Sequence, residues 1–494
     1  MSAEDVLGIV ANGPLPYEFN MLTRGAVPVG EYVVARSAGD EEVLGMVDGS
    51  TINSEMMGMA RTFEDAYAAG RLSAANPRDK SYVSHVRVLG LLDGLRSGEV
   101  RMPSLPPVPG SEVRKASEAE LSEVFGGSGA RWVPIGSLLR RASVRVHVDV
   151  NKVATRHLAI LASTGAGKSN LLALIAKSVA RLRGTMVLFD YHGEYQGLSL
   201  EGREMMVSPA INPRDLDPDE LADLLEVRES ASKQRYVLSQ ALKEARGAKD
   251  FWGGLREAIK ENGKGEYEGA SQRLLDIVDS ALRRIGPVLD PESPPPLKLL
   301  AEGYVNVVDL SGLSPRQADI VISHYLDEIL EDRKRAISGG DAHLRKPVLV
   351  AIEEAHVFVP GGKDERTRSA GPAARIAREG RKFGVSLIIV SQRPSRLNQD
   401  VLSQMGSLAI GRLLSARDRS FVLESSEYLT DEISEYLPDL NPGEAILVGQ
   451  WVKLPAVVKV DLVGEKLRGK DLDVVGEWTS WGGPSEDTDE LMMR

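Results

Sequence analysis

The strongest pattern along the chain is a series of short apolar runs separated by stretches of helical periodicity. From about residue 140 onward the apolar runs read HLAILA, GTMVLFD, YVNVVDL, KPVLVAIEE, VSLIIVS and SLAIGRL. Buried strands that alternate with helices are typical of βαβ units on a parallel sheet. The pattern therefore predicts an α/β core formed by residues 141–213 and 291–455.

Residues 214–290 interrupt this alternation, because they carry helical periodicity with no strand-like run between. The helical stretches read DPDELADLLEVRESASKQRYVLSQALKEA, DFWGGLREAIKEN and ASQRLLDIVDSALRRI. A proline-rich segment, DPESPPPLK, follows them. We therefore expect a helical bundle inserted between the two halves of the α/β core.

The two ends of the chain have patterns of their own. Residues 1–100 alternate β-like runs such as GEYVVARS and EEVLGMVDG with glycine turns, which predicts a small β-barrel or sandwich. The proline-rich stretch MPSLPPVPGSE indicates a linker within residues 101–140. Residues 456–494 show little periodicity and are expected to form a C-terminal extension.

Composition narrows the class of protein. The 494 residues include no cysteine, which excludes disulfides and thiolate chemistry and favours a reducing compartment. The N-terminus lacks the pattern of a signal peptide, and no window holds 18 uninterrupted apolar residues, so we expect a cytoplasmic protein with no membrane segment. The net charge of −11 argues against a surface that coats nucleic acid throughout, although a local basic channel stays compatible with it.

Residues 162–169, ASTGAGKS, fit the Walker A pattern G-x-x-x-x-G-K-[ST] except that alanine replaces the first glycine. An apolar run enters this loop and a helical pattern leaves it, which disfavours the alternative of a glycine-rich turn with a chance lysine. We expect Lys168 to reach the β- and γ-phosphates and the Ser169 hydroxyl to bind Mg²⁺. The predicted nucleotide-binding residues are Ser163, Thr164, Gly165, Ala166, Gly167, Lys168, Ser169 and Asn170.

Two acids end the apolar run KPVLVAIEE. Glu353 is predicted to help hold Mg²⁺, and Glu354 to polarise the attacking water as a general base. The alternative is a solvated strand end, which the Walker A sequence upstream makes less favoured.

Two further strand ends carry polar residues. GTMVLFDYHGEY places Asp190, His192 and Glu194 after a strand, and VSLIIVSQRP places Gln392 after another, at the edge where α/β sheets bind ligands. Gln392 suits a sensor of the γ-phosphate. Ordinary turn chemistry is the alternative for both, and a structural role for His192 is as plausible as a catalytic one.

The segment AARIAREGRKFG is rich in basic residues. Arg378 shares a helical face with Arg375, and Arg381 follows one turn later. Such a run is commonly a solvated face, but it can also supply an arginine finger to a neighbouring subunit. Arg156, just before the first core strand, is a second candidate for that role.

Together these motifs resemble those of one family. The segments TRHLAILASTGAGKSN, FDYHGEY, VLVAIEEAHVF, ARIAREGRKFGVSLIIVSQRP and LNPGEAILVG look like those of HerA, the archaeal hexameric DNA translocase of the FtsK/HerA branch of RecA-like ATPases. The order of a β-barrel, a helical insertion and a C-terminal extension is similar over nearly the whole chain.

The resemblance implies a homo-hexamer that threads double-stranded DNA through its pore, uses ATP and Mg²⁺, and works with the NurA nuclease in processing DNA ends for recombinational repair. By the same resemblance, Glu354 matches the catalytic acid and Gln392 the sensor. Arg156 and Arg381 match arginines that act across the subunit interface. The N-terminal strands match the barrel tier that faces the nuclease.

Contacts to DNA are less specific in the sequence. The mixed-charge segment GGKDERTRS carries Lys363, Arg366 and Arg368, which are predicted to line the pore or simply to be solvated. Arg393 and Arg396 are comparable candidates. Two other functions stay open at this point: a secretion or conjugation-type ATPase of related fold, and a nucleotide-dependent scaffold that assembles a nuclease.

Overall fold

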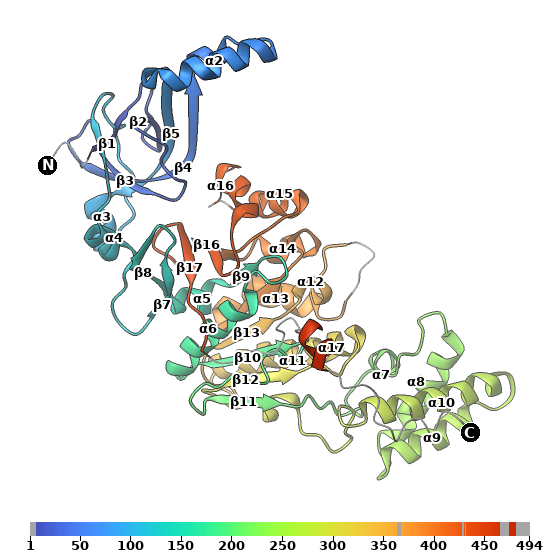
Figure 1. Cartoon of the computed structure of the whole chain (residues 1–494). Helices are drawn as coiled ribbons and strands as arrows, with labels where there is room; N and C mark the ends of the chain where they lie inside the picture. The colour runs from blue at the N-terminus through green and yellow to red at the C-terminus, as the bar shows by residue number, and fades with distance from the viewer. Residues whose placement is uncertain (1–5, 363–366, 427–428, 430, 465–473, 481–494) are drawn as a thin grey trace.

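The computed structural model describes residues 6–362, 367–426, 429, 431–464 and 474–480. Its N-terminal part is a closed antiparallel barrel in the order β1-β2-β5-β4-β3-β6, set apart from a larger α/β body (Figure 1). The barrel strands are β1 (Val6–Val10), β2 (Glu18–Thr23), β3 (Tyr32–Arg36), β4 (Glu42–Ser54), β5 (Lys80–Leu91) and β6 (Glu112–Lys115).

The barrel has a core of its own, built by side chains that alternate between the interior and the outside along each strand. Phe19, Met21 and Val86 are buried in it together with valines from five of the strands. At the distal tip, β4 and β5 are joined by α1 (Glu55–Gly58), α2 (Phe63–Ala75) and η1 (Pro77–Asp79). Two helices lie at the other end, α3 (Leu92–Ser97) and α4 (Glu118–Phe125).

The body is built on an 11-stranded sheet in the order β11-β12-β10-β13-β14-β9-β15-β16-β17-β7-β8. Neighbours from β11 to β15 pair parallel, and the remaining pairs are antiparallel. In chain order the strands are β7 (Trp132–Leu138), β8 (Arg141–Asp149), β9 (Leu158–Leu161), β10 (Thr185–Asp190), β11 (Glu204–Val207), β12 (Val305–Asp309), β13 (Val348–Ile352), β14 (Val385–Ser391), β15 (Ser407–Ile410), β16 (Glu444–Gly449) and β17 (Ala456–Val460).

The central strands β9, β10, β13 and β14 are buried at every residue. A strand covered on both faces requires a continuous apolar run, which is the pattern these segments have.

The helices of the body are α5 (Val150–Arg156), α6 (Lys168–Arg181), α11 (Pro315–Ile337), α12 (Ala355–Phe358), α13 (Ala370–Glu379), α14 (Gln399–Leu402), α15 (Ala416–Glu424), α16 (Asp431–Tyr436) and α17 (Val474–Ser480), with the short turns η3 (Pro296–Leu299), η4 (Gly380–Phe383), η5 (Pro394–Arg396) and η6 (Leu437–Asp439).

The predicted helical insertion lies at one end of the body (Figure 1). It contains α7 (Pro218–Leu224), α8 (Ser232–Ala245), α9 (Phe251–Asn262), η2 (Gly265–Tyr267) and α10 (Glu268–Ile285). The longest of these, α10, buries Leu274, Val278, Ala281 and Ile285, which recur at helical spacing.

Three boundaries differ from those expected from sequence. The barrel continues past residue 100, because β6 closes it between β1 and β3. Residues 132–138, assigned to the connecting segment, form β7 of the main sheet, between β17 and β8. The segment 456–460, assigned to the C-terminal extension, is β17 of the same sheet. These strands pair antiparallel at the margins, where they need no helical crossover.

Candidate functional site

The phosphate loop joins β9 to α6 at the carboxyl edge of the parallel strands. Gly165 and Gly167 have φ of 72° and 105°, values in the left-handed region that favours glycine. Gly167 is the N-cap of α6 and has no side chain to accept a hydrogen bond from the first turn of the helix. Free N–H groups at a helix N-terminus favour a bound phosphate, so this turn is ready to receive one.

Lys168 folds back onto the loop. Its Nζ donates to the carbonyl oxygen of Ser163 at 3.1 Å. Burial lowers the pKa of Lys168, and the nearby carboxylates of Glu354, Glu194 and Glu353 partly oppose that shift. A cation held among acids at this position can neutralise phosphate charge when a nucleotide is bound.

The alanine that replaces the first Walker glycine is accommodated by a second glycine. Ala162 is buried, and a Cβ built on Gly411 would lie only 2.9 Å from the Ala162 Cβ. Gly411 follows β15 and donates its N–H to the carbonyl of Leu161 at 2.9 Å. Residue 411 therefore leaves the space that the Ala162 methyl group fills.

The two predicted acids end β13 beside the loop. Glu353 is 5% exposed, and the phenol of Tyr195 donates to its Oε1 at 3.0 Å. Its Oε2 is buried without a hydrogen-bond partner among the described residues. Burial, with the charges of Glu194 and Asp190, raises the pKa of Glu353 well above its usual range. An unpartnered buried carboxylate oxygen suits a metal ligand.

Glu354 adopts a left-handed backbone with φ of 47°, which is uncommon for a residue with a side chain. Both of its oxygens lie 3.2 Å from the donating Nε2 of Gln392. Burial raises the pKa of Glu354, while the charge of Lys168 and the hydrogen bond from Gln392 oppose that rise. Gln392 also accepts a hydrogen bond from the Thr164 hydroxyl, so it links the phosphate loop to Glu354.

Two histidines lie beside Glu354. The Nε2 atom of His192, which was predicted from the sequence, lies 3.8 Å from Glu354 Oε1. The Nδ1 atom of His356, which was not predicted, lies 3.2 Å from Glu354 Oε2. Burial first, and then the charges of Arg393 and Arg396, lower the pKa of His356 to about 4. His356 is therefore neutral near pH 7 and adds no positive charge beside the carboxylate.

Tyr195 is the other residue that sequence reasoning missed. Its phenol is fully buried and is hydrogen-bonded to both Ser169 and Glu353, the two residues predicted to hold Mg²⁺. Asp190 fixes this tyrosine, because its carboxylate accepts the backbone N–H groups of Glu194 and Tyr195 at 3.0 and 2.9 Å. The only hint in the sequence is a tyrosine in the segment GEY, five residues after β10, and a phenol buried there requires a polar partner.

Mg²⁺ would depend on the nucleotide as well as on the protein. Within the described ranges, no three His, Asp or Glu side chains are arranged to hold a metal ion. Ser169 and Glu353 offer two oxygen ligands, and magnesium sites in phosphoryl-transfer enzymes are usually completed by phosphate and water. Asn170 has a different task, since its side chain donates to the Asp461 carbonyl and accepts from Val463 N–H at 2.8 and 2.9 Å.

The predicted finger arginines lie on the opposite edge of the sheet. Arg156 is two residues before β9, and Arg381 lies in η4, which ends two residues before β14 begins, so both are at the amino ends of parallel strands. Arg378 lies at the end of α13, one turn before Arg381. Since β14 has seven residues at roughly 3.3 Å each, about 20 Å separates this edge from the phosphate loop of the same chain.

The residues predicted to bind DNA belong to two adjoining segments. Gly361 N–H donates to the Arg396 carbonyl at 2.8 Å, which places the segment after β13 against η5. Arg393 and Arg396 are exposed there. Lys363 and Arg366 lie outside the described residues.

Arg368 is placed differently, because its guanidinium contacts a carboxylate of the helical insertion, Asp223 Oδ2, at 3.1 Å. Further acids of the same region lie within 4 Å of the guanidinium, namely Asp217 and Glu220.

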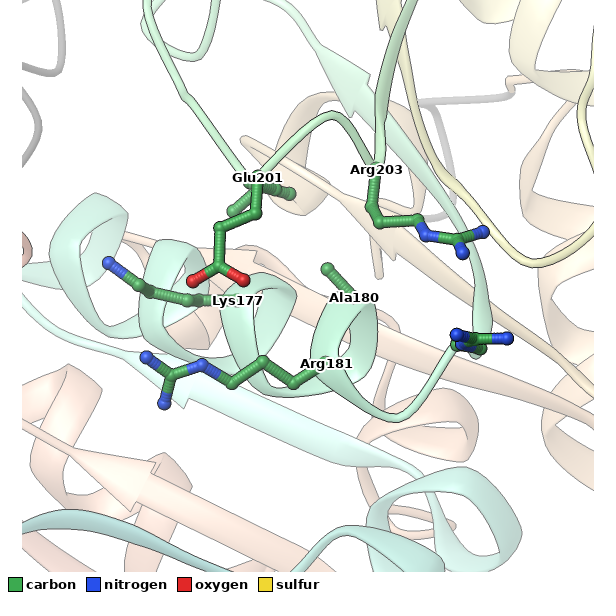
Figure 2. A pocket seen from close by; sticks show the side chains of 7 residues that line it. Lys177, Ala180, Arg181, Glu201 and Arg203 are labelled. Carbon is green, nitrogen blue, oxygen red and sulfur yellow. The ribbon is translucent and has the colours of Figure 1, made fainter.

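A separate hollow of about 230 Å³ also lies at the amino edge of the sheet (Figure 2). Basic side chains surround Glu201 there, and the hollow is lined by Lys177, Ala180, Arg181, Arg183, Leu200, Glu201 and Arg203. Lys177 and Arg181 belong to the last turns of α6, where cations stabilise the carbonyl end of a helix. This hollow is therefore distinct from the phosphate-loop site.

Within the part of the chain that the structure describes, no helix has both the length and the apolar character needed to cross a membrane.

Comparison with known proteins gives a consistent assignment. The family model described as the helicase HerA central domain matches residues 133–329. The DNA double-strand break repair helicase HerA of Sulfurisphaera tokodaii is 37% identical over 491 residues, covering 96% of this chain and 96% of that protein. The helicase of the same name from Saccharolobus solfataricus is 35% identical over 490 residues, covering 96% and 95%. Among solved structures, VirB4 of Thermoanaerobacter pseudethanolicus is 18% identical with a TM-score of 0.49, covering 69% of this chain and 99% of that one.

Proposed function

The chain belongs to the HerA helicase family, and from that premise we propose that it is an ATP-driven translocase of double-stranded DNA whose ATP sites form between the subunits of a hexameric ring. The observation that carries the proposal is the division of the site between two edges of one sheet. Lys168, Glu354 and Gln392 gather at the carboxyl edge, whereas Arg156 and Arg381 lie at the amino edge.

A site divided in this way needs a second subunit. The side chain of Arg381 is exposed and makes no hydrogen bond or ion pair with the described residues. An arginine finger supplied from a neighbour contributes about 10³- to 10⁵-fold in rate to phosphoryl transfer. We infer that the amino edge of one subunit faces the phosphate loop of the next.

Within each site the roles follow from the contacts. Glu354 accepts a proton from the attacking water, Gln392 orients that carboxylate and senses the γ-phosphate, and Lys168 binds the β- and γ-phosphates. Mg²⁺, which Ser169 and Glu353 would hold, neutralises phosphate charge when bound. The pair Glu354 and Gln392 is already hydrogen-bonded to each other, so the base is oriented before a nucleotide arrives.

The decisive test mixes two inactive variants. We expect Lys168→Ala and Arg381→Ala each to lower DNA-stimulated ATP hydrolysis at least tenfold, and equimolar mixtures to regain activity. In the mixture, an intact phosphate loop of one variant meets an intact arginine of the other. Lys382→Ala, which changes a neighbouring exposed cation in the same turn, is the matched control and should hydrolyse ATP normally. If the mixture regains no activity, Arg381 does not act across the interface. If the Glu354→Gln variant still hydrolyses ATP, Glu354 is not the general base.

The adjoining segments around Arg393 and Arg396 support the DNA contact. Exposed cations beside the ATP site can bind backbone phosphates, and six copies around a pore would concentrate positive charge despite the net charge of the monomer. The double variant Arg393→Ala/Arg396→Ala should bind duplex DNA more weakly at every sequence and show a shallower dependence of affinity on salt. Unchanged binding across a salt series would place the DNA contact elsewhere.

The distal tip of the barrel supports a partnership with the NurA nuclease. Met59, Phe63 and Tyr67 are 78%, 78% and 63% exposed at this tip, and the rings of Phe63 and Tyr67 stack with their centroids 6.4 Å apart. A capping box between Thr62 and Asp65 fixes the start of α2, so the apolar face is presented by an ordered helix. Exposed apolar patches of a few hundred Å² commonly mark protein interfaces.

We therefore expect Phe63→Ser/Tyr67→Ser to reduce co-purification with NurA while DNA-independent ATP hydrolysis stays normal. The change Tyr236→Ser, at an exposed aromatic residue of the helical insertion, is the control. Retained binding by the barrel double variant would assign the nuclease to another surface.

A further inference from the structure

His157 lies between a predicted finger arginine and the first core strand, and its backbone is strained. The residue has φ of 61° and ψ of 160°, a region that essentially only glycine occupies. A side chain held there costs roughly 1–3 kcal/mol and persists only when its surroundings fix it. His157 is also 3% exposed, so its ring is part of the interior.

His157 is bonded to β14 and α13 through its ring, and to α5 through the Ser386 hydroxyl. Its Nδ1 accepts the N–H of Leu387 at 2.9 Å, and its other side is hydrogen-bonded to the backbone of Ala377 in α13. The backbone N–H of His157 donates to the Ser386 hydroxyl at 3.2 Å, and that hydroxyl donates to the carbonyl of Val153 in α5 at 2.7 Å. An accepting Nδ1 means that the proton is on Nε2, so the ring is the neutral tautomer with both nitrogens engaged. Burial agrees with this state, since it lowers the pKa of His157 to about 4.

These contacts tie together the elements that carry the arginines of the amino edge. Arg156 is the residue directly before His157, and its carbonyl accepts the N–H of Gly406 at 2.8 Å. Arg378 directly follows Ala377, and Arg381 lies one turn further along in η4. The ring of His157 is therefore the link between the segment of Arg156 and the segment of Arg378 and Arg381.

From this geometry we propose that His157 is a positioning residue, which holds Arg156 and the arginines of α13 and η4 in a fixed mutual arrangement so that they reach the nucleotide of the neighbouring subunit together. The inference rests on the proposed function, because it requires that arginines act across the interface. It explains why a histidine occupies a backbone conformation that glycine adopts without strain. The interactions of the ring offset the strain, and the function requires the ring.

The backbone conformation makes His157→Gly an informative variant. Glycine adopts this φ and ψ freely, so the variant relieves the strain while it removes the ring's hydrogen bonds to β14 and α13. The Ser386 hydroxyl still donates to the Val153 carbonyl of α5. The variant leaves the Leu387 N–H without its acceptor, but the phosphate loop at the other edge is untouched. We expect nucleotide affinity to stay within about twofold of the parent protein. Misplacement of a catalytic group by about 1 Å can lower a rate about 100-fold, so we expect kcat to fall at least tenfold.

The test is trans-complementation with Lys168→Ala subunits. A His157→Gly subunit has a competent phosphate loop and displaced arginines, so mixing it with Lys168→Ala subunits should restore hydrolysis. His343→Ala removes another histidine that is hydrogen-bonded to a backbone carbonyl, that of Leu300, and should lose no activity. Arg381→Ala mixed with Lys168→Ala tests the premise independently.

Three results would overturn the proposal. One is a His157→Gly protein with normal kcat. Another is a loss of activity that Lys168→Ala subunits cannot restore although they restore Arg381→Ala, because this marks general damage to the fold. The third is that a mixture of Arg381→Ala and Lys168→Ala subunits regains no hydrolysis. This result refutes the premise that arginines act across the interface, and the inference about His157 with it. Because that mixture contains no His157 variant, the two failures can be told apart.

Discussion

Replacing Gly411 by alanine should displace the phosphate loop. The new Cβ would lie 2.9 Å from the Ala162 Cβ, closer than such atoms approach in proteins, and 3.8 Å from the Ala166 Cβ. Inserting a methyl group into a packed site costs about 1–3 kcal/mol. The strain is relieved most easily by movement of the loop, because Gly411 itself is fixed through its hydrogen bond to Leu161.

That energy corresponds to a nucleotide affinity lowered by roughly 5- to 150-fold, at about 1.4 kcal/mol for each factor of ten. The reciprocal change provides the proof, because Ala162→Gly removes the opposing methyl group. Alone it should cost only about 1 kcal/mol of stability, from a lost buried methyl and a more flexible loop. In the double variant Ala162→Gly/Gly411→Ala most of the affinity should return, which gives a coupling energy above about 1 kcal/mol.

The assay is titration of a fluorescent ADP analogue into each variant, with urea unfolding to separate loop displacement from global destabilisation. Gly312→Ala is the matched control, since a Cβ added there meets no atom within 4 Å. The reasoning is refuted if Gly411→Ala binds nucleotide normally, or if Ala162→Gly fails to restore binding in the double variant.

Two further predictions concern the acids. Gln392→Leu removes a hydrogen bond that lowers the pKa of Glu354, so that pKa should rise further above its usual value. Because the deprotonated carboxylate is the active form, the fall of kcat toward acid should begin at higher pH than in the parent protein, and an unshifted pH profile would contradict the role of Glu354 as base. Tyr195→Phe leaves Oε1 of Glu353 without its donor and should raise the Mg²⁺ concentration needed for half-maximal hydrolysis by about 10- to 100-fold. Tyr191→Phe is its control, and an equal effect in both variants would contradict this role for Tyr195.

The central fold was predictable because the strands of a parallel sheet are buried on both faces and read as continuous apolar runs. Strand β13 is an example, because the apolar run in KPVLVAIEE predicts the strand and the two glutamates that follow it predict the acids of the site. The prediction of a barrel is confirmed, and the prediction of its end at residue 100 is not. Strand β6 has only four residues and one fully buried position, so it leaves almost no periodic signal.

Contacts between distant residues were beyond sequence reasoning. The Tyr195 phenol and Glu353 are 158 positions apart, and only the adjacency of β10 and β13 brings them together. The fit between Ala162 and Gly411 depends likewise on the pairing of β9 with β15. A local motif identifies the loop, but the register of the sheet decides what lies beside it.

The separation of the two half-sites on one rigid sheet has a consequence for assembly. If subunits join head to tail in this way, an open row of them always ends in one protomer whose bound triphosphate faces empty solvent. Closing the circle is the only arrangement that completes every site. The rate of ATP hydrolysis would then report whether the ring has closed around the duplex. A subunit outside a ring would hydrolyse almost no ATP.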